Sequence, residues 1–436
     1  MLQQHILNEV IKEIPQTDAH WEIFFLKRRL YCVEGKDLRI DKKKTASHEF
    51  FSIRVIKDKK AGFATCGQKN KIKEAFEFAL NIAKASDPDE FLNLPEPREI
   101  EKLDVFDEKL INKKDLLPDF LLDMQSEALF DRRIKKIRNA EITVTVDERG
   151  VINSKGITVY EPSTTCSAYI VTIAENGDSQ MGWSYRAERF IKNISFEAVS
   201  REAGLNALML LNSKKIKPYR GQAVFSPLVA SQFLGVIAQS LSAENYQKGK
   251  SVFTGRMGQP VIGESLDIID DGLLPERFGS ISFDAEGVCT SKKTLIEKGI
   301  LKFLLHNTYT ACRAGTRSTG NAVRTDAGVS AGPTNLYIET EEKLNPEDLI
   351  KLVERGIYII EVMGIHTANP VSGDFSVGIS GIYIEKGEMK YPVKEAVISG
   401  NVVQIFQNIR AVGNDIKFFG NIGSPTLLVE GVDISG

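Results

Sequence analysis

Gly249, Lys250 and Ser251 resemble the end of a phosphate-binding loop. The full pattern needs another Gly five residues before the second one, so that backbone N–H groups can surround the phosphates. That position is Glu244, whose carboxylate would repel a phosphate. Residues 252–255 also do not begin a clear helix. The segment therefore argues against ATP or GTP binding.

A second segment, Gly328 to Gly332, has the pattern Gly-x-Ser-x-Gly. A serine nucleophile in this pattern must stand on a tight turn between a strand and a helix. Pro333 and the strand-like residues 335–338 follow instead, and no Ser-x-x-Lys pattern offers a lysine base. We interpret the segment as a glycine-rich loop. A hydrolase that uses Ser330 stays open as a third interpretation of the chain.

The histidines do not form a metal motif. A structural or catalytic zinc site usually includes two ligands close together on one helix or turn. The five histidines are far apart, and His48-Glu49 is followed by a strand-like alternation without a second His. We interpret each one as a surface or core residue: His5, His20, His48, His306 and His366.

Three polar segments late in the chain are candidates for binding. The acids of residues 283–287 are typical of a turn, although they could bind a cation. Residues 319–324 and 372–378 are rich in Gly and polar side chains, which allows close approach of a peptide or a partner chain. They could equally be connectors. The candidate peptide contacts are Asn321, Arg324, Gly373, Asp374 and Ser376.

The elements that must position these residues form three units and a linker. We expect an N-terminal α/β unit at 1–86, a linker at 87–110, a middle α/β unit at 111–215 and a β-rich domain at 216–436. Helices are predicted where apolar residues recur at helical spacing. Their ranges are 2–14, 71–85, 115–130, 196–212, 227–242, 307–314 and 346–355.

Short polar turns that end in Gly separate several strand-like runs. Gly35, Gly150, Gly299 and Gly387 each follow such a pattern, which is typical of hairpins with a positive φ. Hairpins favour antiparallel sheets, so the chain is predicted to be an α+β protein rather than a doubly wound one. Asn70 is predicted to cap the helix that begins at Lys71.

Composition excludes several classes of protein. The 436 residues carry 56 basic and 58 acidic side chains, so no global positive field favours nucleic acid. The five cysteines form no Cys-x-x-Cys pair, which suits free thiols in a reducing compartment. The N-terminus does not read as a signal peptide, and no apolar run reaches the roughly 20 residues that a membrane span needs. We expect a cytoplasmic protein that does not bind membranes.

Three stretches resemble one known family. They are residues 251–259, residues 283–288 with 294–301 and 319–321, and the C-terminal segments around 372–376, 382–388, 391–393 and 425–429. In this order they are similar to the TldD/PmbA family, long called modulators of DNA gyrase. The resemblance spans the length of the chain, and its specific motifs follow residue 216.

The resemblance implies a place for metal chemistry that this chain has lost. The metal-bearing members hold zinc through His-Glu-x-x-x-His and a later cysteine, and the Glu would activate a metal-bound water. Aligned without gaps, these positions fall on Leu234, Gly235 and Gln239, and the cysteine would fall at 411–416. Leu234, Gly235 and Gln239 do not suit zinc, and the last cysteine of the chain is Cys312. The chain therefore resembles the TldE/PmbA branch, which lacks the motif.

By this resemblance, we expect the chain to bind no cofactor and to have no catalytic residues of its own. It would pair with a TldD-like paralogue that holds zinc, and the complex would process unfolded or leader peptides. The chain would help by holding an extended peptide through strand-like pairing. The alternative is a stand-alone homodimeric protein that binds peptides or modulates a partner without proteolysis.

Overall fold

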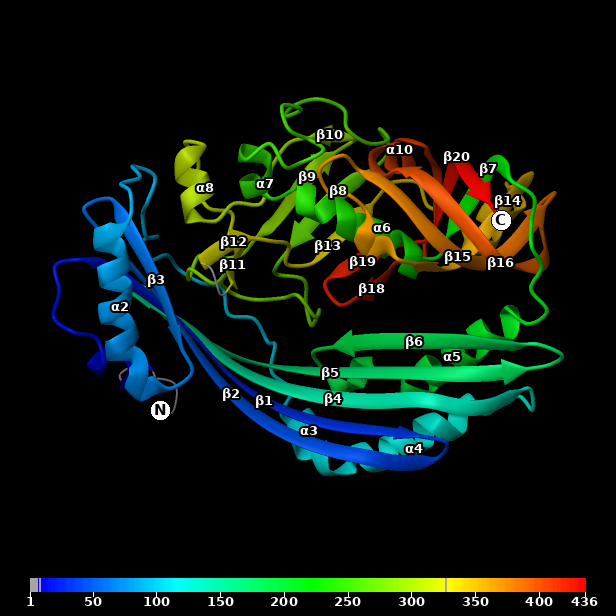
Figure 1. The fold of residues 1–436 in the computed structure, drawn as a ribbon, viewed down its shortest axis with the longest axis horizontal. Coiled ribbons are helices and arrows are strands. Elements are labelled where there is room, and N and C mark those ends of the chain that lie inside the picture. The colour runs from blue at the N-terminus through cyan, green and yellow to red at the C-terminus, as the bar shows by residue number, and fades with distance from the viewer. Residues whose placement is uncertain (1–6, 8, 326–327) are drawn as a thin grey trace.

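The computed structural model describes residues 7, 9–325 and 328–436 and shows a long N-terminal sheet beside a C-terminal domain (Figure 1). The N-terminal sheet has six antiparallel strands in the order β3-β2-β1-β4-β5-β6. Since β1 pairs with β4, the ranges 1–86 and 111–215 share this sheet. Its strands are β1 (His20–Lys36), β2 (Arg39–Lys57), β3 (Lys60–Cys66), β4 (Ile134–Asn153), β5 (Thr158–Glu175) and β6 (Ser179–Glu188).

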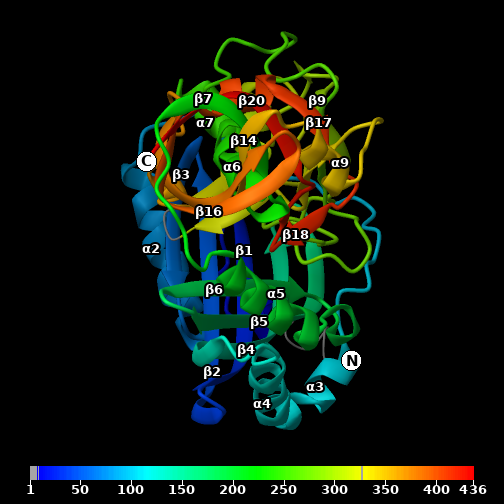
Figure 2. The same cartoon turned by 90° about the vertical axis from the view of Figure 1, so that its right-hand side faces the viewer.

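Helices cover one face of this sheet. Side chains alternate between the faces, so Val33 in β1 and Ile142 in β4 pack with the apolar sides of α4 and α5. Towards the other end of the strands, Ile23 packs with Ile72 and Phe76 of α2. Figure 2 shows α4 and α5 along the sheet. These helices are α2 (Ile72–Ala85), α3 (Glu108–Asn112), α4 (Leu117–Ala128) and α5 (Phe196–Met209).

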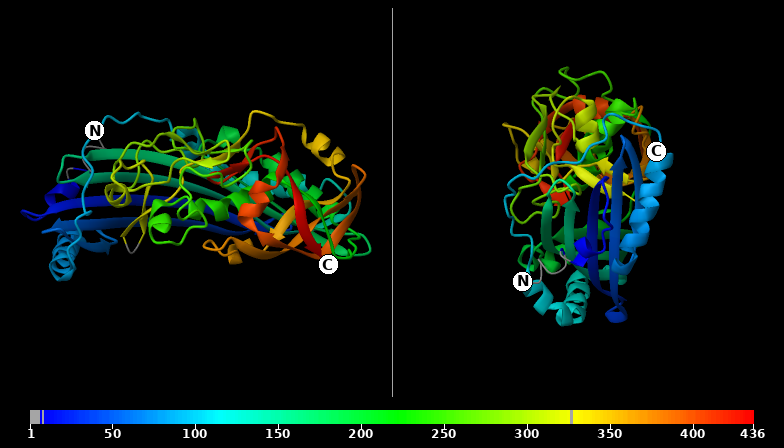
Figure 3. Two further views of the ribbon diagram at one scale, coloured as in Figure 1. Left: turned by 90° about the horizontal axis from the view of Figure 1, so that it is seen from above. Right: turned by 90° about the vertical axis from the view of Figure 1, so that its left-hand side faces the viewer.

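At the end of the strands near α2, the opposite face of the sheet docks on the C-terminal domain. Phe24 of β1 and Val151 of β4 form an apolar cluster with Phe283, Ala285 and Ala322. Seen from above, the long strands run beneath the C-terminal domain along the long axis of the molecule (Figure 3). The two parts therefore share an apolar interface at the end of the sheet near α2.

The C-terminal domain contains two further six-stranded sheets and a hairpin. The first sheet has the order β16-β15-β14-β7-β20-β17, and an additional β16–β20 pairing closes five of its strands into a ring. The second has the order β10-β9-β8-β13-β19-β18, and β11 pairs with β12. Most pairings are antiparallel, which confirms the predicted α+β class and its β-rich end; β7–β14 and β13–β19 are parallel.

The bounds of these C-terminal elements are as follows. The strands of the ring-forming sheet are β7 (Tyr219–Phe225), β14 (Arg355–Met363), β15 (Asp374–Glu385), β16 (Glu388–Asn401), β17 (Ile409–Val412) and β20 (Leu427–Ser435). The other strands are β8 (Asp267–Asp271), β9 (Lys292–Glu297), β10 (Ile300–Leu301), β11 (Ala322–Thr325), β12 (Gly328–Ala331), β13 (Leu336–Glu339), β18 (Lys417–Phe419) and β19 (Ile422–Ser424). The helices are α6 (Pro227–Ser240), α7 (Ala243–Gln247), α8 (Thr308–Arg313), α9 (Pro346–Lys351) and α10 (Val402–Gln407).

Two of the four predicted glycine turns are correct. Gly299 and Gly387 have φ values of 76° and 74° and follow β9 and β15. The other two predictions are wrong, because Gly35 lies within β1 and Gly150 within β4. A Cβ at Gly150 would approach the ring of Phe25 to 2.5 Å, so this glycine makes room for an aromatic side chain.

The helix boundaries also differ in detail from the prediction. The cap at Asn70 is wrong: Asn70 lies in a short 3₁₀ turn (Lys69–Lys71), and Lys71 precedes α2 without a side-chain cap. Of the helix expected at 2–14, residues 7 and 9–12 are helical as predicted, residues 13–14 form a turn and a bend, and residues 2–6 and 8 lie outside the described residues. Residues 87–107 form no helix or strand and contain a single turn at 90–91. In the part of the chain that the structure describes, no helix is long and apolar enough to span a bilayer.

Candidate functional site

Helix α6 is anchored in the core of the C-terminal domain. It begins after β7, where the hydroxyl of Ser226 accepts a hydrogen bond from the Val229 backbone N–H at 3.4 Å. The ring of Phe233 lies 5.0 Å from the ring of Phe225 and 5.0 Å from that of Phe375. The helix is thus fixed between two strands of the ring-forming sheet.

The three expected metal-motif positions on α6 offer no metal site. Leu234 is fully buried among apolar side chains, Gly235 has no side chain, and Gln239 is exposed. The nearest atom to a Cβ built at Gly235 is Ile422 Cδ1 at 3.7 Å, so the space beside the helix is not filled. An apolar side chain, a glycine and an amide do not fit zinc.

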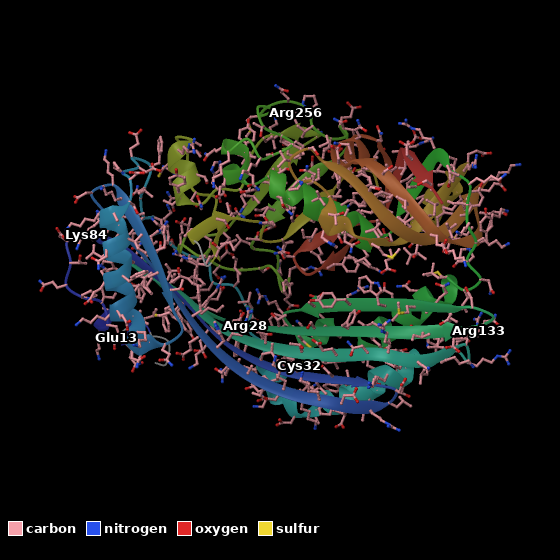
Figure 4. All side chains as sticks on the ribbon, in the orientation of Figure 1. Glu13, Arg28, Cys32, Lys84, Arg133 and Arg256 are labelled. Atoms are coloured by element: carbon pink, nitrogen blue, oxygen red, sulfur yellow. The ribbon has the colours of Figure 1, made fainter. Side chains whose placement is uncertain are left out.

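The structure brings one potential set of metal ligands together elsewhere. Among the described residues, ligand atoms of Cys32, Glu34 and Glu141 lie within 4.8 Å of one another, on β1 and β4 of the N-terminal sheet. Figure 4 labels Cys32 on that sheet, away from α6. Burial raises the pKa of the Cys32 thiol, which disfavours the thiolate that a metal needs. This group is unrelated to the metal positions that the family resemblance implies on α6.

Asn321 is a buried structural contact in this structure. Its side-chain amide donates to Asp270 Oδ2 at 2.8 Å and to the Gly332 carbonyl at 3.0 Å. Asp270 also lies 3.2 Å from Lys293 Nζ. Asn321 is only 2% exposed, so its amide holds the start of the β11–β12 hairpin against β8. Contact with a peptide through this side chain stays a prediction.

Arg324 belongs to a buried charge network between the N-terminal sheet and the C-terminal domain. Its guanidinium pairs with Glu22 of β1. Arg54 of β2 lies 3.0 Å from the second Glu22 oxygen and 2.7 Å from Glu286 Oε1. All four side chains are at most 4% exposed. Arg324 would have to leave Glu22 before it could contact a peptide.

The acidic turn that contains Glu286 is held by Asp284. The carboxylate of Asp284 accepts hydrogen bonds from the backbone N–H groups of Glu286, Val288 and Ala322 at 2.8–3.0 Å. Burial, followed by the charge of Glu286, raises the pKa of Asp284 to about 7. The structure thus agrees with the turn interpretation of residues 283–287.

Gly373, Asp374 and Ser376 lie on a different part of the domain. Gly373 has a φ of 83° and precedes β15, where Asp374 and Ser376 are exposed while Phe375 points into the core. Asp374 accepts a hydrogen bond from the Asn401 amide at 3.0 Å, which lowers the pKa of Asp374. Figure 1 shows β15 in the ring-forming sheet and β11 beside the N-terminal sheet. The five candidate peptide contacts therefore form two separate groups.

The two short motifs with possible chemistry have structural positions. Ser251 donates to the Ser240 carbonyl at 2.7 Å and so fixes the loop to the end of α6. Ser330 lies in β12 and not in a loop, which corrects the sequence interpretation. The next element after β12 is the strand β13 rather than a helix, so Ser330 does not stand on a nucleophile turn.

Comparison with known proteins gives the family. Models of the PmbA/TldA metallopeptidase domain 1, central domain and C-terminal domain match residues 21–83, 96–211 and 218–436. This chain belongs to the PmbA/TldD metallopeptidase family. The three matched ranges cover most of the sequence, which confirms the resemblance seen in the motifs.

Three relatives illustrate the extent of the similarity. An uncharacterized protein of Methanocaldococcus jannaschii is 31% identical over 98% of this chain and 99% of its own length. A metalloprotease PmbA homolog of Buchnera aphidicola is 28% identical over 84% of this chain and 81% of its own length. The crystal structure of TldE from Thermococcus kodakarensis has a TM-score of 0.87, with 26% identity and full coverage of both chains.

The sequence of this PmbA/TldD family member does not by itself predict the buried network. Glu22 stands in the apolar run 21–25, and Arg54 stands in the run 50–56. A single charge inside an apolar strand is unusual unless it is paired. Two such charges of opposite sign could have indicated a buried ion pair. The sequence alone, however, does not show that Glu22 in β1 stands opposite Arg54 in β2.

Proposed function

We propose that this chain is the subunit without metal in a PmbA/TldD-type protease complex. The observation that carries the proposal is α6, where Leu234, Gly235 and Gln239 stand at the positions that the family resemblance implies for the metal motif. A metal-bearing paralogue would supply zinc and the activated water. This chain would complete the peptide-binding space and act in the cytoplasm.

The part of the chain that would meet a peptide is the second group of candidates. Asp374 and Ser376 are exposed on β15, whereas Asn321 and Arg324 are buried and paired within the protein. An extended peptide could use these side chains together with backbone groups. The alternative function, a homodimeric peptide-binding protein, uses the same surface without a catalytic partner.

The two proposed functions can be distinguished by whether the chain assembles with a paralogue or with itself. The full chain would be co-expressed with a His-Glu-x-x-x-His paralogue from the same genome and analysed by size exclusion with light scattering. A 1:1 complex, with zinc in the paralogue, supports the subunit function. A stable homodimer that does not bind the paralogue favours the stand-alone function.

A further inference from the structure

A pocket of about 260 Å³ lies where three parts of the chain meet. Thr308, Ala311 and Cys312 line one side, and their spacing of three and four residues places them on one face of α8. Residues 93–98 of the linker and Lys155 of the β4–β5 turn line the other side. Figure 1 shows α8 at the end of the C-terminal domain nearest α2 and β3.

The pocket contains a buried hydroxyl without a partner. Thr308 is 7% exposed, and its Oγ1 forms no hydrogen bond among the described residues. Its backbone N–H is already used, because it donates to Glu286 Oε2 at 2.7 Å. A buried polar group left unpaired is unfavourable, because it has lost its hydrogen bonds to water. A polar ligand atom in the pocket would remove this cost.

The charge around the pocket is positive. Arg98, Lys155 and Arg317 line it, and Glu96 is the single acid among the described lining residues. Lys155 Nζ lies 3.8 Å from Glu96 Oε1. Within the described chain, neither Arg98 nor Arg317 has a carboxylate at ion-pair distance. Two guanidinium groups are therefore available for an anion, and such planar groups suit a carboxylate.

Apolar residues from both sides also line the pocket. Leu94, Pro95 and Pro97 belong to the linker, and Val288 and Ala311 belong to the C-terminal domain. We propose that the pocket binds a small organic anion with an apolar body and one carboxylate, such as the C-terminal residue of a short peptide. The carboxylate meets the guanidinium groups and the Thr308 hydroxyl, while the body displaces water from the apolar wall.

Binding can be measured on the full chain alone, without any protease activity. Isothermal titration calorimetry would compare N-acetyl-L-leucine with N-acetyl-L-leucinamide, which lacks the charge, and with inorganic phosphate, which lacks the apolar body. Iodoacetamide labelling, read by mass spectrometry, would follow Cys312 in the pocket. Cys66 at the end of β3 is the internal reference.

We expect the acid to bind at least tenfold more tightly than the amide or phosphate and to slow labelling of Cys312 but not of Cys66. Arg317→Gln and Thr308→Val should each weaken the acid about tenfold, as loss of a charge-assisted hydrogen bond does. Arg313→Gln, on α8 but outside the lining, is the matched control. Equal binding of amide or phosphate, or unchanged Cys312 labelling at saturating acid, would overturn the proposal.

Discussion

Arg54 Nη2 lies 2.7 Å from Oε1 of Glu286, and this ion pair joins the N-terminal sheet to the C-terminal domain. The two side chains are 4% and 0% exposed. Both are therefore removed from water, and each depends on the other for compensation of its charge. This pair, with Glu22 and Arg324, fixes how the sheet meets the domain that carries α6.

Removing Arg54 should destabilise the protein strongly. Arg54→Met leaves Glu286 buried without its cation, and such a loss costs about 3–5 kcal/mol in free energy of unfolding. The additional change Glu286→Gln removes the unpaired charge and should recover part of that loss. Urea unfolding followed by circular dichroism measures both.

The matched control for this prediction is an ion pair on the same sheet whose arginine is exposed. Arg28, which is labelled in Figure 4, pairs with Asp147 at 2.7 Å, and its side chain is 48% exposed. Arg28→Met should cost no more than about 1 kcal/mol. If Arg54→Met costs as little as Arg28→Met, the buried network does not hold the two parts together.

Gly235→Ala should stabilise the protein by about 0.5–1 kcal/mol. The residue lies inside α6, where alanine has a higher helix propensity, and its Cβ would meet only one atom, at 3.7 Å. Thermal unfolding measures the change. Gly62→Ala is the contrasting variant, because its Cβ would lie 1.9 Å from the Ala79 carbonyl oxygen and must destabilise β3 against α2. A loss of stability in Gly235→Ala would show that the space beside α6 is filled.

Stability should fall on acidification through His306. Burial lowers the pKa of His306 in the folded chain below its ordinary value of about 6.5. Between these two values the unfolded chain binds more protons, so stability is full above pH ~6.5 and is lost as pH falls towards the folded pKa. His306→Gln should flatten this part of the pH–stability curve. The exposed His366→Gln serves as control, and equal slopes in both variants would contradict the assignment.

Asp374→Ala should weaken peptide capture without unfolding the chain. The carboxylate is exposed, so the free energy of unfolding should change by about 0.5 kcal/mol or less. Peptide binding to the assembled complex, measured by fluorescence anisotropy, should fall. Exposed Glu388→Ala in β16 provides the comparison. Unchanged affinity in Asp374→Ala would remove β15 from the peptide surface.

The sequence predicts turns well where the turn itself demands a glycine. Gly299 and Gly387 occupy positive φ, and a local pattern is enough to find them. The local pattern wrongly predicts a turn at Gly150. A glycine is needed there because the ring of Phe25 lies against it from the neighbouring strand, more than a hundred residues away in sequence. The β1–β2 turn uses Asp37 and Leu38 at positive φ, without any glycine.

Side-chain roles are harder to predict than the fold class. The alternation of apolar residues is local, so it predicts strands and helices over most of the chain. Whether Arg324 is exposed or buried depends on Glu22, which pairs with it from the other end of the sequence. The sequence could identify Arg324 as a candidate, but only the three-dimensional structure shows that its charge is already used.

Zinc content measured together with peptidase activity tests the central claim most directly. The purified full chain would be assayed alone and after assembly with the His-Glu-x-x-x-His paralogue, with metal measured by mass spectrometry. We predict no stoichiometric zinc and no cleavage of unfolded peptides by the chain alone, and chelator-sensitive cleavage by the complex. One zinc per chain, with chelator-sensitive cleavage by the chain alone, would contradict the account.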